Sequence, residues 1–307
     1  MRAAGTPAPL LGSEASAPAA FPSWRLGLPR GRTLELGGGH AKVMGVLNLT
    51  PDSFSDGGAF LTPDDAIRHG ARLVDEGADV LDVGGESTRP GAAAVESDEE
   101  LRRVIPVIEG LTQMQQTTPI SIDTRKPEVA RAALEAGARI VNDTRGGRDP
   151  AMLETVATTG AGVVLMHMLG EPQTMQDDPR YDDVVAEVTE FLRERIEAAV
   201  FAGIPEERIC IDPGIGFGKN VDHNLALLRS VPALRPLGAA VMIGASRKRF
   251  IGVLTGSENP ADRLEGSLAV AVLAASLGAD VVRVHDVAAT VRALQVTDAV
   301  VRERPHA

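Results

Sequence analysis

One phrase recurs along this chain and constrains its fold more than any other feature: a helical stretch, the pair Gly-Ala, and a short run rich in β-branched residues. The pair stands at residues 77–78, 137–138, 160–161, 238–239 and 278–279. Glycine commonly ends helices because it adopts the left-handed conformation without steric penalty, so each pair predicts a helix end followed by a strand start. The strands we predict are 43–47, 79–84, 118–123, 139–142, 162–167, 208–212, 240–244 and 280–285.

Helix starts are signalled as well. Thr62-Pro63, Asp149-Pro150 and Asn259-Pro260 each place a capping side chain before a proline at the first helical position, and residues 97–100 fit a capping box. Eight strands that alternate with helices predict an α/β fold with a parallel sheet, and their number favours a closed (β/α)8 TIM barrel. The alternative, an open doubly wound sheet, needs a Gly-rich phosphate fingerprint after its first strand, and residues 45–48 do not fit one.

The composition and the start of the chain agree with this architecture. Hydrophobic residues make up 44% and aromatic residues only 3%, so the core is built from Val, Ile, Leu and Ala, as in strands buried on both faces. Residues 24–38 alternate around a Pro-Arg-Gly-Arg turn, which predicts an N-terminal hairpin within residues 23–40 at the N-terminal end of the barrel. We expect residues 1–22 to be a disordered extension and residues 41–303 to form one domain.

Charge, hydropathy and cysteine usage exclude several classes of protein. The net charge of −11 argues against a nucleic-acid-binding surface, which is normally basic. No apolar run approaches the roughly 18–20 residues of a membrane span. The single cysteine, Cys210, rules out an internal disulfide and fits a reducing compartment, so we expect a cytoplasmic protein. Its place in an Ile-Cys-Ile run predicts a packed core thiol rather than a nucleophile.

Polar side chains stand at the carboxyl end of every predicted strand, where TIM barrels carry their active sites. A single Asp or Asn at such a position often only caps the next helix, as we expect for Asp286. Eight such ends around one mouth favour a ligand site instead, and the first of them opens a long polar loop, residues 48–61. The strand-end residues are Asn48, Asp82, Glu86, Asp123, Asn142, Asp143, His167, Asp212, Ser246, Lys248, Arg283 and His285.

These residue types suggest what the ligand carries. Four cations at the mouth of an acidic protein, Arg89, Lys219, Lys248 and Arg283, suit an anionic ligand, because Arg and Lys bind carboxylate and phosphate groups. Buried Asp and Asn side chains at strand ends need hydrogen-bond donors, which a flat heterocycle with N–H groups supplies.

The motifs offer limited options for metal and covalent chemistry. Asn48 presents a neutral oxygen that can bind Mg²⁺ if phosphate and water complete the shell, whereas no His- or Cys-rich spacing for zinc occurs. No Ser-His-Asp or Cys-His arrangement is signalled, so we do not expect covalent catalysis.

Taken together, the motifs resemble those of dihydropteroate synthase, a pterin-binding TIM-barrel family. They keep their order from about residue 43 to 300. The motifs are Asn-Leu-Thr-Pro-Asp-Ser-Phe-Ser-Asp-Gly-Gly at 48–58, Asp-Val-Gly-Gly-Glu-Ser-Thr-Arg-Pro-Gly at 82–91, Ser-Ile-Asp-Thr at 121–124, Val-Asn-Asp at 141–143, Met-His-Met at 166–168, Asp-Pro-Gly-Ile-Gly-Phe-Gly-Lys at 212–219, Gly-Ala-Ser-Arg-Lys at 244–248 and Arg-Val-His-Asp at 283–286.

The resemblance implies a transferase of folate biosynthesis, of the family that sulfonamides target, with Mg²⁺ as cofactor. Its substrates are 6-hydroxymethyl-7,8-dihydropterin pyrophosphate and 4-aminobenzoate, and its products are 7,8-dihydropteroate and pyrophosphate. The resemblance also implies a homodimer. The Ala-rich face of a helix over residues 261–277 is suited either to such an interface or to packing on the barrel.

The resemblance assigns residues to each part of the site. The catalytic set is Asn48, Lys248, Arg283 and His285. The pterin is held by Asp123, Asn142, Met166, Asp212 and Lys248. Pyrophosphate meets Asn48, Arg283 and His285, with Asn48 at the metal. The aminobenzoate side comprises Thr88, Arg89, Pro90, Phe217 and Ser246, and the loop 50–58 closes over the reacting carbon.

The sequence departs from the family pattern in two places, and two other functions stay open. Arg249 stands where many relatives have Ser, and the stretch 144–147 after Asn142-Asp143 is unusual. Methyltransferases that use methyltetrahydrofolate share the pterin-binding barrel but have no use for the pyrophosphate and aminobenzoate parts, so the motifs at 88–90, 246–248 and 283–285 favour the synthase. A pterin-binding paralogue without turnover is the non-enzymatic alternative.

Overall fold

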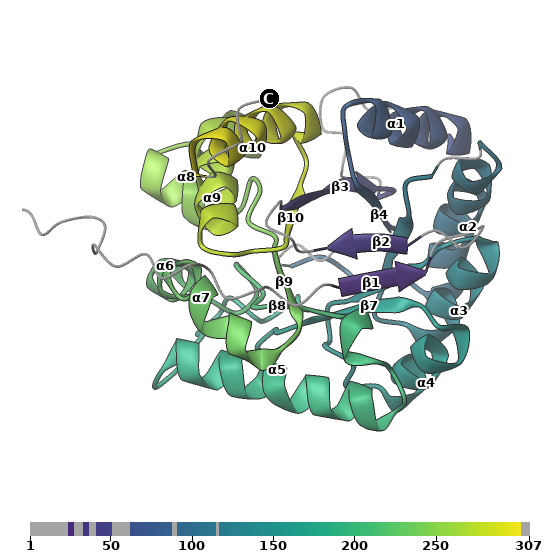
Figure 1. The fold of residues 1–307 in the computed structure, drawn as a ribbon, viewed down its shortest axis with the longest axis horizontal. Helices are drawn as coiled ribbons and strands as arrows, with labels where there is room; N and C mark the ends of the chain where they lie inside the picture. Colours follow the sequence, from purple (N-terminus) through teal and green to yellow (C-terminus); the bar gives the residue numbers. More distant parts are fainter. Residues whose placement is uncertain are drawn as a thin grey trace, which may run out of the picture.

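Eight parallel strands close into a barrel in the computed structural model (Figure 1), which describes residues 24–27, 33–36, 41–50, 62–87, 91–114 and 117–301. Around the barrel the order is β10-β3-β4-β5-β6-β7-β8-β9. The strands are β3 (Lys42–Asn48), β4 (Val80–Gly84), β5 (Ile120–Asp123), β6 (Ile140–Asp143), β7 (Gly162–Met166), β8 (Ile209–Asp212), β9 (Ala240–Ile243) and β10 (Val281–Val284). Each predicted strand is present within two residues at either end, so the predicted (β/α)8 barrel is confirmed.

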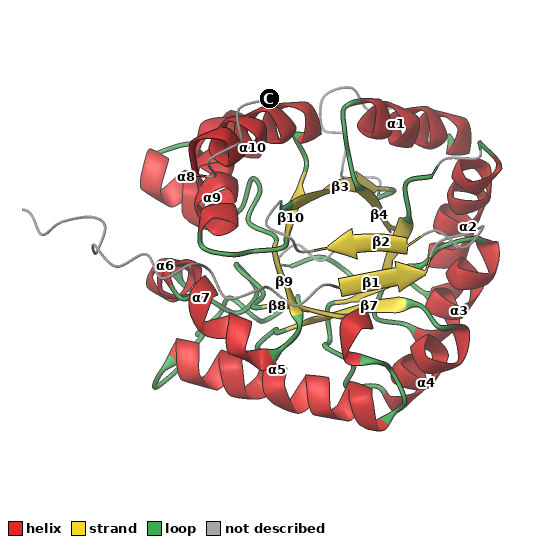
Figure 2. Cartoon of the chain, in the orientation of Figure 1, coloured by secondary structure: helices red, strands yellow, loops and turns green. Residues whose placement is uncertain are grey.

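Helices cover the outside of the barrel (Figure 2). They are α1 (Pro63–Asp75), α2 (Ser97–Gln113), α3 (Pro127–Ala136), α4 (Pro150–Thr159), α5 (Val184–Phe201), α6 (Val221–Arg229), α7 (Val231–Leu234), α8 (Arg249–Thr255), α9 (Leu264–Ser276) and α10 (Val287–Val301). The described residues also form three 3₁₀ turns, which are η3 (Glu206–Arg208), η4 (Arg235–Leu237) and η5 (Pro260–Asp262). The glycines of the recurring Gly-Ala pair all have positive φ, at 101°, 126°, 70°, 82° and 100° in chain order, as the helix-end prediction requires.

The predicted caps are confirmed at three positions and wrong at one. Thr62 caps α1 in a reciprocal capping box, and Asp149 accepts the N–H of Ala151 at the start of α4. The capping box predicted at 97–100 is wrong, because Ser97 is already inside α2 and its hydroxyl donates to Glu128 of α3. Asn259 accepts the N–H of Ala261 and caps the 3₁₀ turn η5 as predicted, but the helix expected from residue 261 starts only at Leu264.

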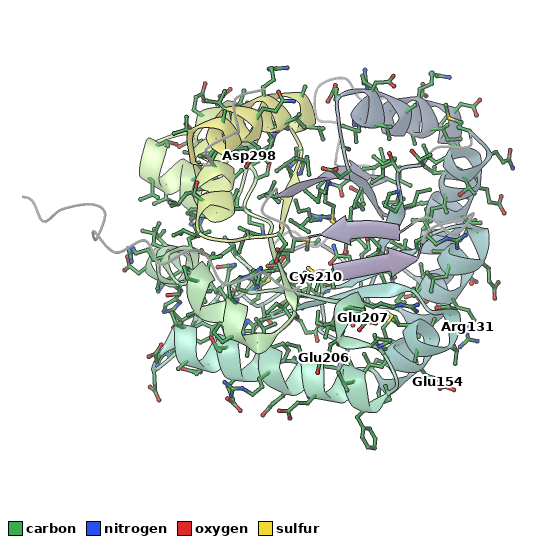
Figure 3. The ribbon with its side chains drawn as sticks, in the orientation of Figure 1. Arg131, Glu154, Glu206, Glu207, Cys210 and Asp298 are labelled. Carbon is green, nitrogen blue, oxygen red and sulfur yellow. The ribbon has the colours of Figure 1, made fainter. Side chains whose placement is uncertain are left out.

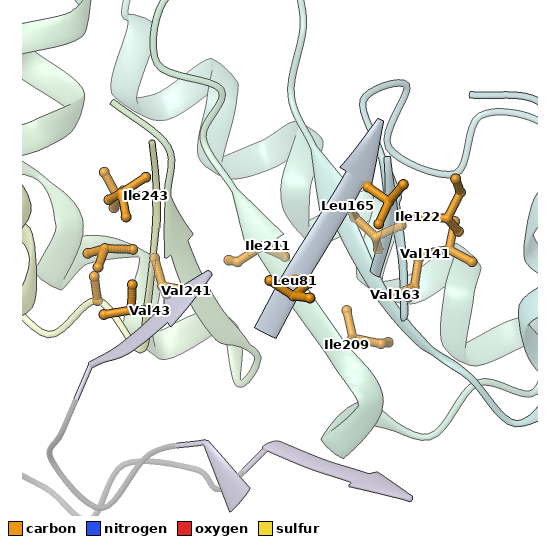
Figure 4. Packing of buried hydrophobic residues seen from close by; sticks show 14 of the residues in the cluster. Val43, Leu81, Ile122, Val141, Val163, Leu165, Ile209, Ile211, Val241 and Ile243 are labelled. Carbon is orange, nitrogen blue, oxygen red and sulfur yellow. The ribbon is translucent and has the colours of Figure 1, made fainter. Parts of the chain in front are cut away.

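Two apolar layers hold the barrel together. The larger layer lies between the strands and the surrounding helices, where Figure 4 shows residues such as Leu81, Val163 and Ile211. The second, which we call the interior layer, comprises Met44, Val80, Ile140, Val164, Cys210, Ala240, Met242 and Val281. Its members alternate along the strands with those of the outer layer, so they fill the inside of the barrel. Cys210 belongs to this layer and is fully buried (Figure 3), which fits the prediction of a packed thiol.

A two-stranded hairpin precedes the barrel, as predicted. β1 (Trp24–Gly27) pairs antiparallel with β2 (Thr33–Leu36). The backbone of β1 contacts η3, which leads directly into β8, so the hairpin lies at the N-terminal end of the strands, across the opening seen in Figure 1. The expected extension at 1–22 lies outside the described residues, and the domain boundaries stay a prediction. Within the described ranges, no helix is long and apolar enough to span a membrane.

Candidate active site

The polar residues of the barrel mouth follow from the same alternation that fills the barrel interior. Side chains two residues apart on a strand point to the same face. A polar side chain therefore comes directly above a member of the interior layer on four strands, and the pairs are Val80–Asp82, Ile140–Asn142, Cys210–Asp212 and Val281–Arg283. We call Asp82, Asn142, Asp212 and Arg283 the polar layer. It lies at the carboxyl ends of the strands, where TIM barrels bind their ligands.

Arg283 ties three strands together at this level. Its Nε donates to Asp82 Oδ2 at 2.6 Å, and its Nη2 donates to Asp123 Oδ2 at 2.7 Å. The same Asp82 oxygen accepts the Nδ2 of Asn142 at 3.0 Å. Asp82 is fully buried, and its carboxylate joins the guanidinium of Arg283 on β10 to the amide of Asn142 on β6. The sequence placed Asp82 at a strand end but gave it no role; its position two residues after Val80 is the signal that could have revealed one.

Three buried polar atoms at Asp82 and its neighbours have no hydrogen-bond partner among the described residues. They are Asp82 Oδ1, Asn142 Oδ1 and the hydroxyl of Ser121, which stands opposite Asp82 in the β4–β5 register. A buried polar group without a partner costs roughly 1–3 kcal/mol. Donors brought close to these oxygens would remove that cost.

Burial changes the acidity of the two carboxyl groups that line the mouth. It raises the pKa of Asp123 to about 7, against the opposing effect of Arg283. It also raises the pKa of Asp212, which the positive charge of Lys248 lowers in turn. One oxygen of Asp212 accepts the N–H of Gly214 at 2.7 Å, which fixes the carboxyl group. Both groups titrate closer to neutral pH than an exposed aspartate does.

Lys248 and Phe217 form one wall of the site. The Nζ of Lys248 donates to the carbonyl of Ile215 and lies 4.3 Å from the centroid of the Phe217 ring. Burial lowers the pKa of Lys248 to about 8, while Asp212 raises it. Phe217 packs on a cluster of three buried methionines, Met166, Met168 and Met175. The wall thus combines an apolar surface with one cation.

The remaining strand ends complete the ring of residues. The hydroxyl of Ser246 accepts the backbone N–H of His285 at 3.2 Å and lies 3.1 Å from its Nδ1. Gly84 separates Asn48 from Asp123, since a Cβ added there would lie 3.5 Å from Asn48 Oδ1 and from the Asp123 Cβ. Nine predicted site residues lie at the carboxyl ends of the strands or in the loops that follow them. They are Asn48, Asp123, Asn142, Met166, Asp212, Ser246, Lys248, Arg283 and His285.

Comparisons with known proteins place this arrangement in a family. The sequence profile of the pterin binding enzymes matches residues 44–285. The chain is 49% identical over 270 residues to dihydropteroate synthase of Escherichia coli K12, which covers 88% of this chain and 94% of that relative. The chain belongs to the dihydropteroate synthase family.

Solved structures of the family agree with this assignment. Dihydropteroate synthase of Xanthomonas albilineans with 4-aminobenzoic acid superposes with a TM-score of 0.84 at 56% identity, over 91% of this chain and 98% of that one. The enzyme of the same species in complex with 7,8-dihydropteroate gives a TM-score of 0.80 at 52% identity, over 90% and 98%. The resemblance expected from the motifs is therefore confirmed.

The described residues offer a divalent metal few ligands of their own. No group of three His, Cys, Asp or Glu side chains in the described ranges could hold a metal ion. Asn48 Oδ1 and the Cβ of Asp123 both lie 3.5 Å from the Cβ position of Gly84, and the Asn48 oxygen is neutral, of a kind that Mg²⁺ accepts as a ligand. Because Mg²⁺ commonly keeps several waters and binds phosphate oxygens, this donor set fits Mg²⁺ that arrives with an anionic substrate.

Lys219 and His167 contact each other. Lys219, one of the four cations expected at the mouth, is buried, and its Nζ donates to the carbonyl of Phe217 at 2.9 Å. Its Nζ also lies 2.9 Å from Nδ1 of His167. Burial, together with the nearby charge of Lys219, lowers the pKa of His167 to about 2, so the imidazole is neutral. These two side chains join β7 to the loop after β8, and their part in binding the ligand stays a prediction.

Other strand-end residues hold their own loops. Asp143 accepts the N–H groups of Arg145 at 2.8 Å and Gly147 at 2.7 Å, which shapes the unusual stretch 144–147. Asp286 was expected to cap the last helix with its side chain. Its carboxylate instead accepts hydrogen bonds from Arg247, from Nε at 3.0 Å and from Nη2 at 2.5 Å.

Arg249, the segment 88–90 and the loop 50–58 are the sequence features that remain. Arg249 is exposed at the first position of α8. The predicted aminobenzoate residues Thr88, Arg89 and Pro90 lie outside the described residues, as does most of the loop 50–58.

Proposed function

We propose that this chain condenses 6-hydroxymethyl-7,8-dihydropterin pyrophosphate with 4-aminobenzoate to give 7,8-dihydropteroate and pyrophosphate. One observation carries the proposal: Asp123, Asn142 and Asp212 present buried acceptors in the same mouth as the cations Lys248 and Arg283. Such a site suits a heterocycle with N–H groups that also bears an anionic arm. The relatives solved with 4-aminobenzoic acid and with 7,8-dihydropteroate support the choice of substrates.

The pterin ring is assigned to the deeper part of the mouth. Asp123 and Asp212 accept its N–H groups when they are ionised, and Asn142 Oδ1, which has no partner among the described residues, offers a third acceptor. Met166 supplies apolar contact for one face of the ring. Lys248 adds a donor for ring acceptors.

The pyrophosphate arm is assigned to Asn48, Arg283 and His285. Arg283 keeps a fixed position through Asp82 and Asp123, so its charge is available without reorganisation when the leaving group departs. Asn48 would hold Mg²⁺ together with pyrophosphate oxygens, and the metal would supply further neutralisation of the departing charge.

4-Aminobenzoate is assigned to the side formed by Phe217 and Ser246, together with Thr88, Arg89 and Pro90. Ser246 is held by His285, and Phe217 by the methionine cluster, so this side has one polar and one apolar wall. Such a pair suits a flat aromatic ring with a carboxylate at one end.

The reaction breaks the bond between the pterin methylene carbon and the bridging oxygen, and the electron pair leaves with pyrophosphate. The electron-rich dihydropterin stabilises the cationic methylene, so the step is dissociative and SN1-like. The amine nitrogen of 4-aminobenzoate then forms the new C–N bond, and its proton passes to solvent. An aromatic amine is neutral near pH 7, so positioning and electrostatic stabilisation do most of the work, with no strong base.

One assay separates this function from its alternatives. Purified protein with Mg²⁺ and both substrates is expected to release pyrophosphate and form dihydropteroate in equal amounts. A methyltransferase of the same fold binds methyltetrahydrofolate and releases no pyrophosphate. A pterin-binding paralogue without turnover binds the dihydropterin and forms no product. Absence of product at saturating substrates contradicts the proposal.

We also infer a homodimer built on the helices α8, α9 and α10. α9 packs against both α8 and α10, and exposed apolar side chains gather on these three helices: Val253, Leu254, Leu273, Val296 and Val300. Exposed apolar groups collected on neighbouring elements indicate an interaction surface. Sedimentation is expected to give twice the 32.2 kDa chain mass, and Leu254→Glu with Leu273→Glu is expected to give monomers. A monomeric wild-type protein at micromolar concentration contradicts this inference.

A further inference from the structure

The loop between β8 and α6, residues 213–220, has its peptide groups bonded by side chains from other parts of the chain. The carbonyl of Gly216 accepts Nε2 of Gln176 at 2.6 Å, and its N–H donates to Oδ1 of Asn224 at 2.7 Å. The carbonyl of Gly218 accepts the hydroxyl of Tyr181 at 2.9 Å. Gln176 and Tyr181 both lie between β7 and α5, in a stretch to which the sequence assigned no function.

Close backbone packing explains why the loop is rich in glycine. Gly214, Gly216 and Gly218 have φ values of 68°, 85° and 63°, which side-chain-bearing residues rarely adopt. A Cβ at Gly214 would lie 1.8 Å from the carbonyl oxygen of His167, and one at Gly218 would lie 2.5 Å from that of Leu169. The loop therefore rests directly on the chain that leaves β7.

This loop sets the position of Phe217 and contacts Lys248. Phe217 stands between Gly216 and Gly218, whose carbonyls Gln176 and Tyr181 hold. The carbonyl of Phe217 is itself held by Lys219. The Phe217 ring therefore keeps its place under the Lys248 ammonium because its flanking peptides are fixed.

The stretch between β7 and α5 also hydrogen-bonds to Gly91. The carbonyl of Pro172 accepts the N–H of Gly91 at 3.1 Å, one residue beyond the assigned segment 88–90. Glu171 pairs with Arg125 at 3.0 Å and with Arg145 at 2.7 Å, which anchors this end of the stretch on the loops after β5 and β6. One stretch thus bonds both to the loop that carries Phe217 and to Gly91.

We propose that Gln176 and Tyr181 are positioning residues for 4-aminobenzoate. They act through the carbonyls of Gly216 and Gly218 to fix Phe217, one wall of the subsite, while Pro172 fixes the start of the chain after residue 90. The inference rests on the proposed function. It assigns a role in substrate specificity to the stretch between β7 and α5, which lies outside the strand-end residues.

Near-isosteric variants test this role. Gln176→Met and Tyr181→Phe remove the two donors, and the phenylalanine keeps a ring that packs edge-on against His223 at 4.9 Å between centroids. Gln173→Met is the matched control, because Gln173 is exposed in the same stretch. The readouts are KM for each substrate, kcat and the melting temperature.

The double variant is expected to raise KM for 4-aminobenzoate about ten-fold, which corresponds to 1.4 kcal/mol. KM for the dihydropterin substrate is expected to change by less than about three-fold, because Gln176 and Tyr181 hydrogen-bond to the carbonyls of Gly216 and Gly218 and not to Asp123, Asn142 or Asp212. Gln173→Met is expected to match the wild type.

Two results would overturn the assignment. One is a double variant whose KM for 4-aminobenzoate stays within about two-fold of the wild-type value. The other is a parallel rise of both KM values with a lowered melting temperature, which indicates a general structural role. If the wild-type protein itself forms no dihydropteroate, the proposed function fails, and the positioning role fails with it.

Discussion

Asp82 is the residue whose removal should damage the site most specifically. Its carboxylate is fully buried and holds both Arg283 and Asn142 through one oxygen, at 2.6 and 3.0 Å. Asp82→Ala leaves the guanidinium with Asp123 alone and leaves the Asn142 amide without its acceptor. Asp82→Asn keeps the volume and one acceptor oxygen but removes the charge.

The size of the effect follows from the burial of the pair. Breaking a buried ion pair by removing one partner costs about 3–5 kcal/mol. The Arg283 side chain retains 20% exposure and keeps its bond to Asp123, so the lower value, about 3 kcal/mol, applies to Asp82→Ala. At about 2 °C per kcal/mol, the melting temperature falls by about 6 °C. Asp82→Asn loses about 1–2 kcal/mol, the difference between a charged and a neutral hydrogen bond.

The activity assay separates a local effect from general destabilisation. Asp280→Ala is the matched control, since Asp280 is buried, pairs with Arg235 and accepts the N–H of Val241 at the opposite end of the barrel. We expect both alanine variants to lose stability, but only Asp82→Ala to lose kcat/KM, by about 100-fold or 2.7 kcal/mol. Equal kcat/KM for the two variants, measured well below their melting temperatures, would refute the positioning of Arg283 and Asn142 by Asp82.

Three further expectations concern the mouth itself. The carboxylate of Asp123 forms above its pKa of about 7, and Lys248 keeps its charge below its pKa of about 8. We therefore expect kcat/KM for the dihydropterin substrate to fall on both sides of pH 7–8. In Lys248→Arg the alkaline fall should vanish, and its persistence would exclude Lys248 as its source. Asp212→Ala should abolish pterin binding in calorimetry, where an unchanged affinity contradicts its role as an acceptor. Arg283→Ala combined with His285→Ala should nearly abolish turnover, and a rate close to wild type would show that the charge of the leaving group is stabilised elsewhere.

The fold could be predicted because its signals are local. A glycine that ends a helix and the β-branched run after it lie within a few residues of each other. Each strand predicted from them matches one strand of the barrel. The errors also have local causes. Ser97 offered a capping hydroxyl, but its hydroxyl bonds to Glu128 of the neighbouring helix, a partner 31 residues away.

The site could be predicted only in part, because side-chain direction and long-range pairing are not local. Asp82 and Arg283 are 201 residues apart and meet only because the barrel closes between β10 and β3. No local pattern in the sequence reveals that Nζ of Lys219 contacts Nδ1 of His167, a residue 52 positions away. The bonds from Gln176 and Tyr181 end on backbone carbonyls, which carry no residue-type pattern in a sequence.

The central claim is that the strand-end residues of this barrel bind the dihydropterin and its pyrophosphate arm. A crystal structure with 6-hydroxymethyl-7,8-dihydropterin pyrophosphate and Mg²⁺ tests it most directly. We predict ring N–H groups within hydrogen-bond distance of Asp123, Asn142 Oδ1 and Asp212, and pyrophosphate oxygens beside Asn48, Arg283 and His285. A ligand bound at another surface, or a ring in the mouth without contact to any of the three acceptors, would contradict the claim.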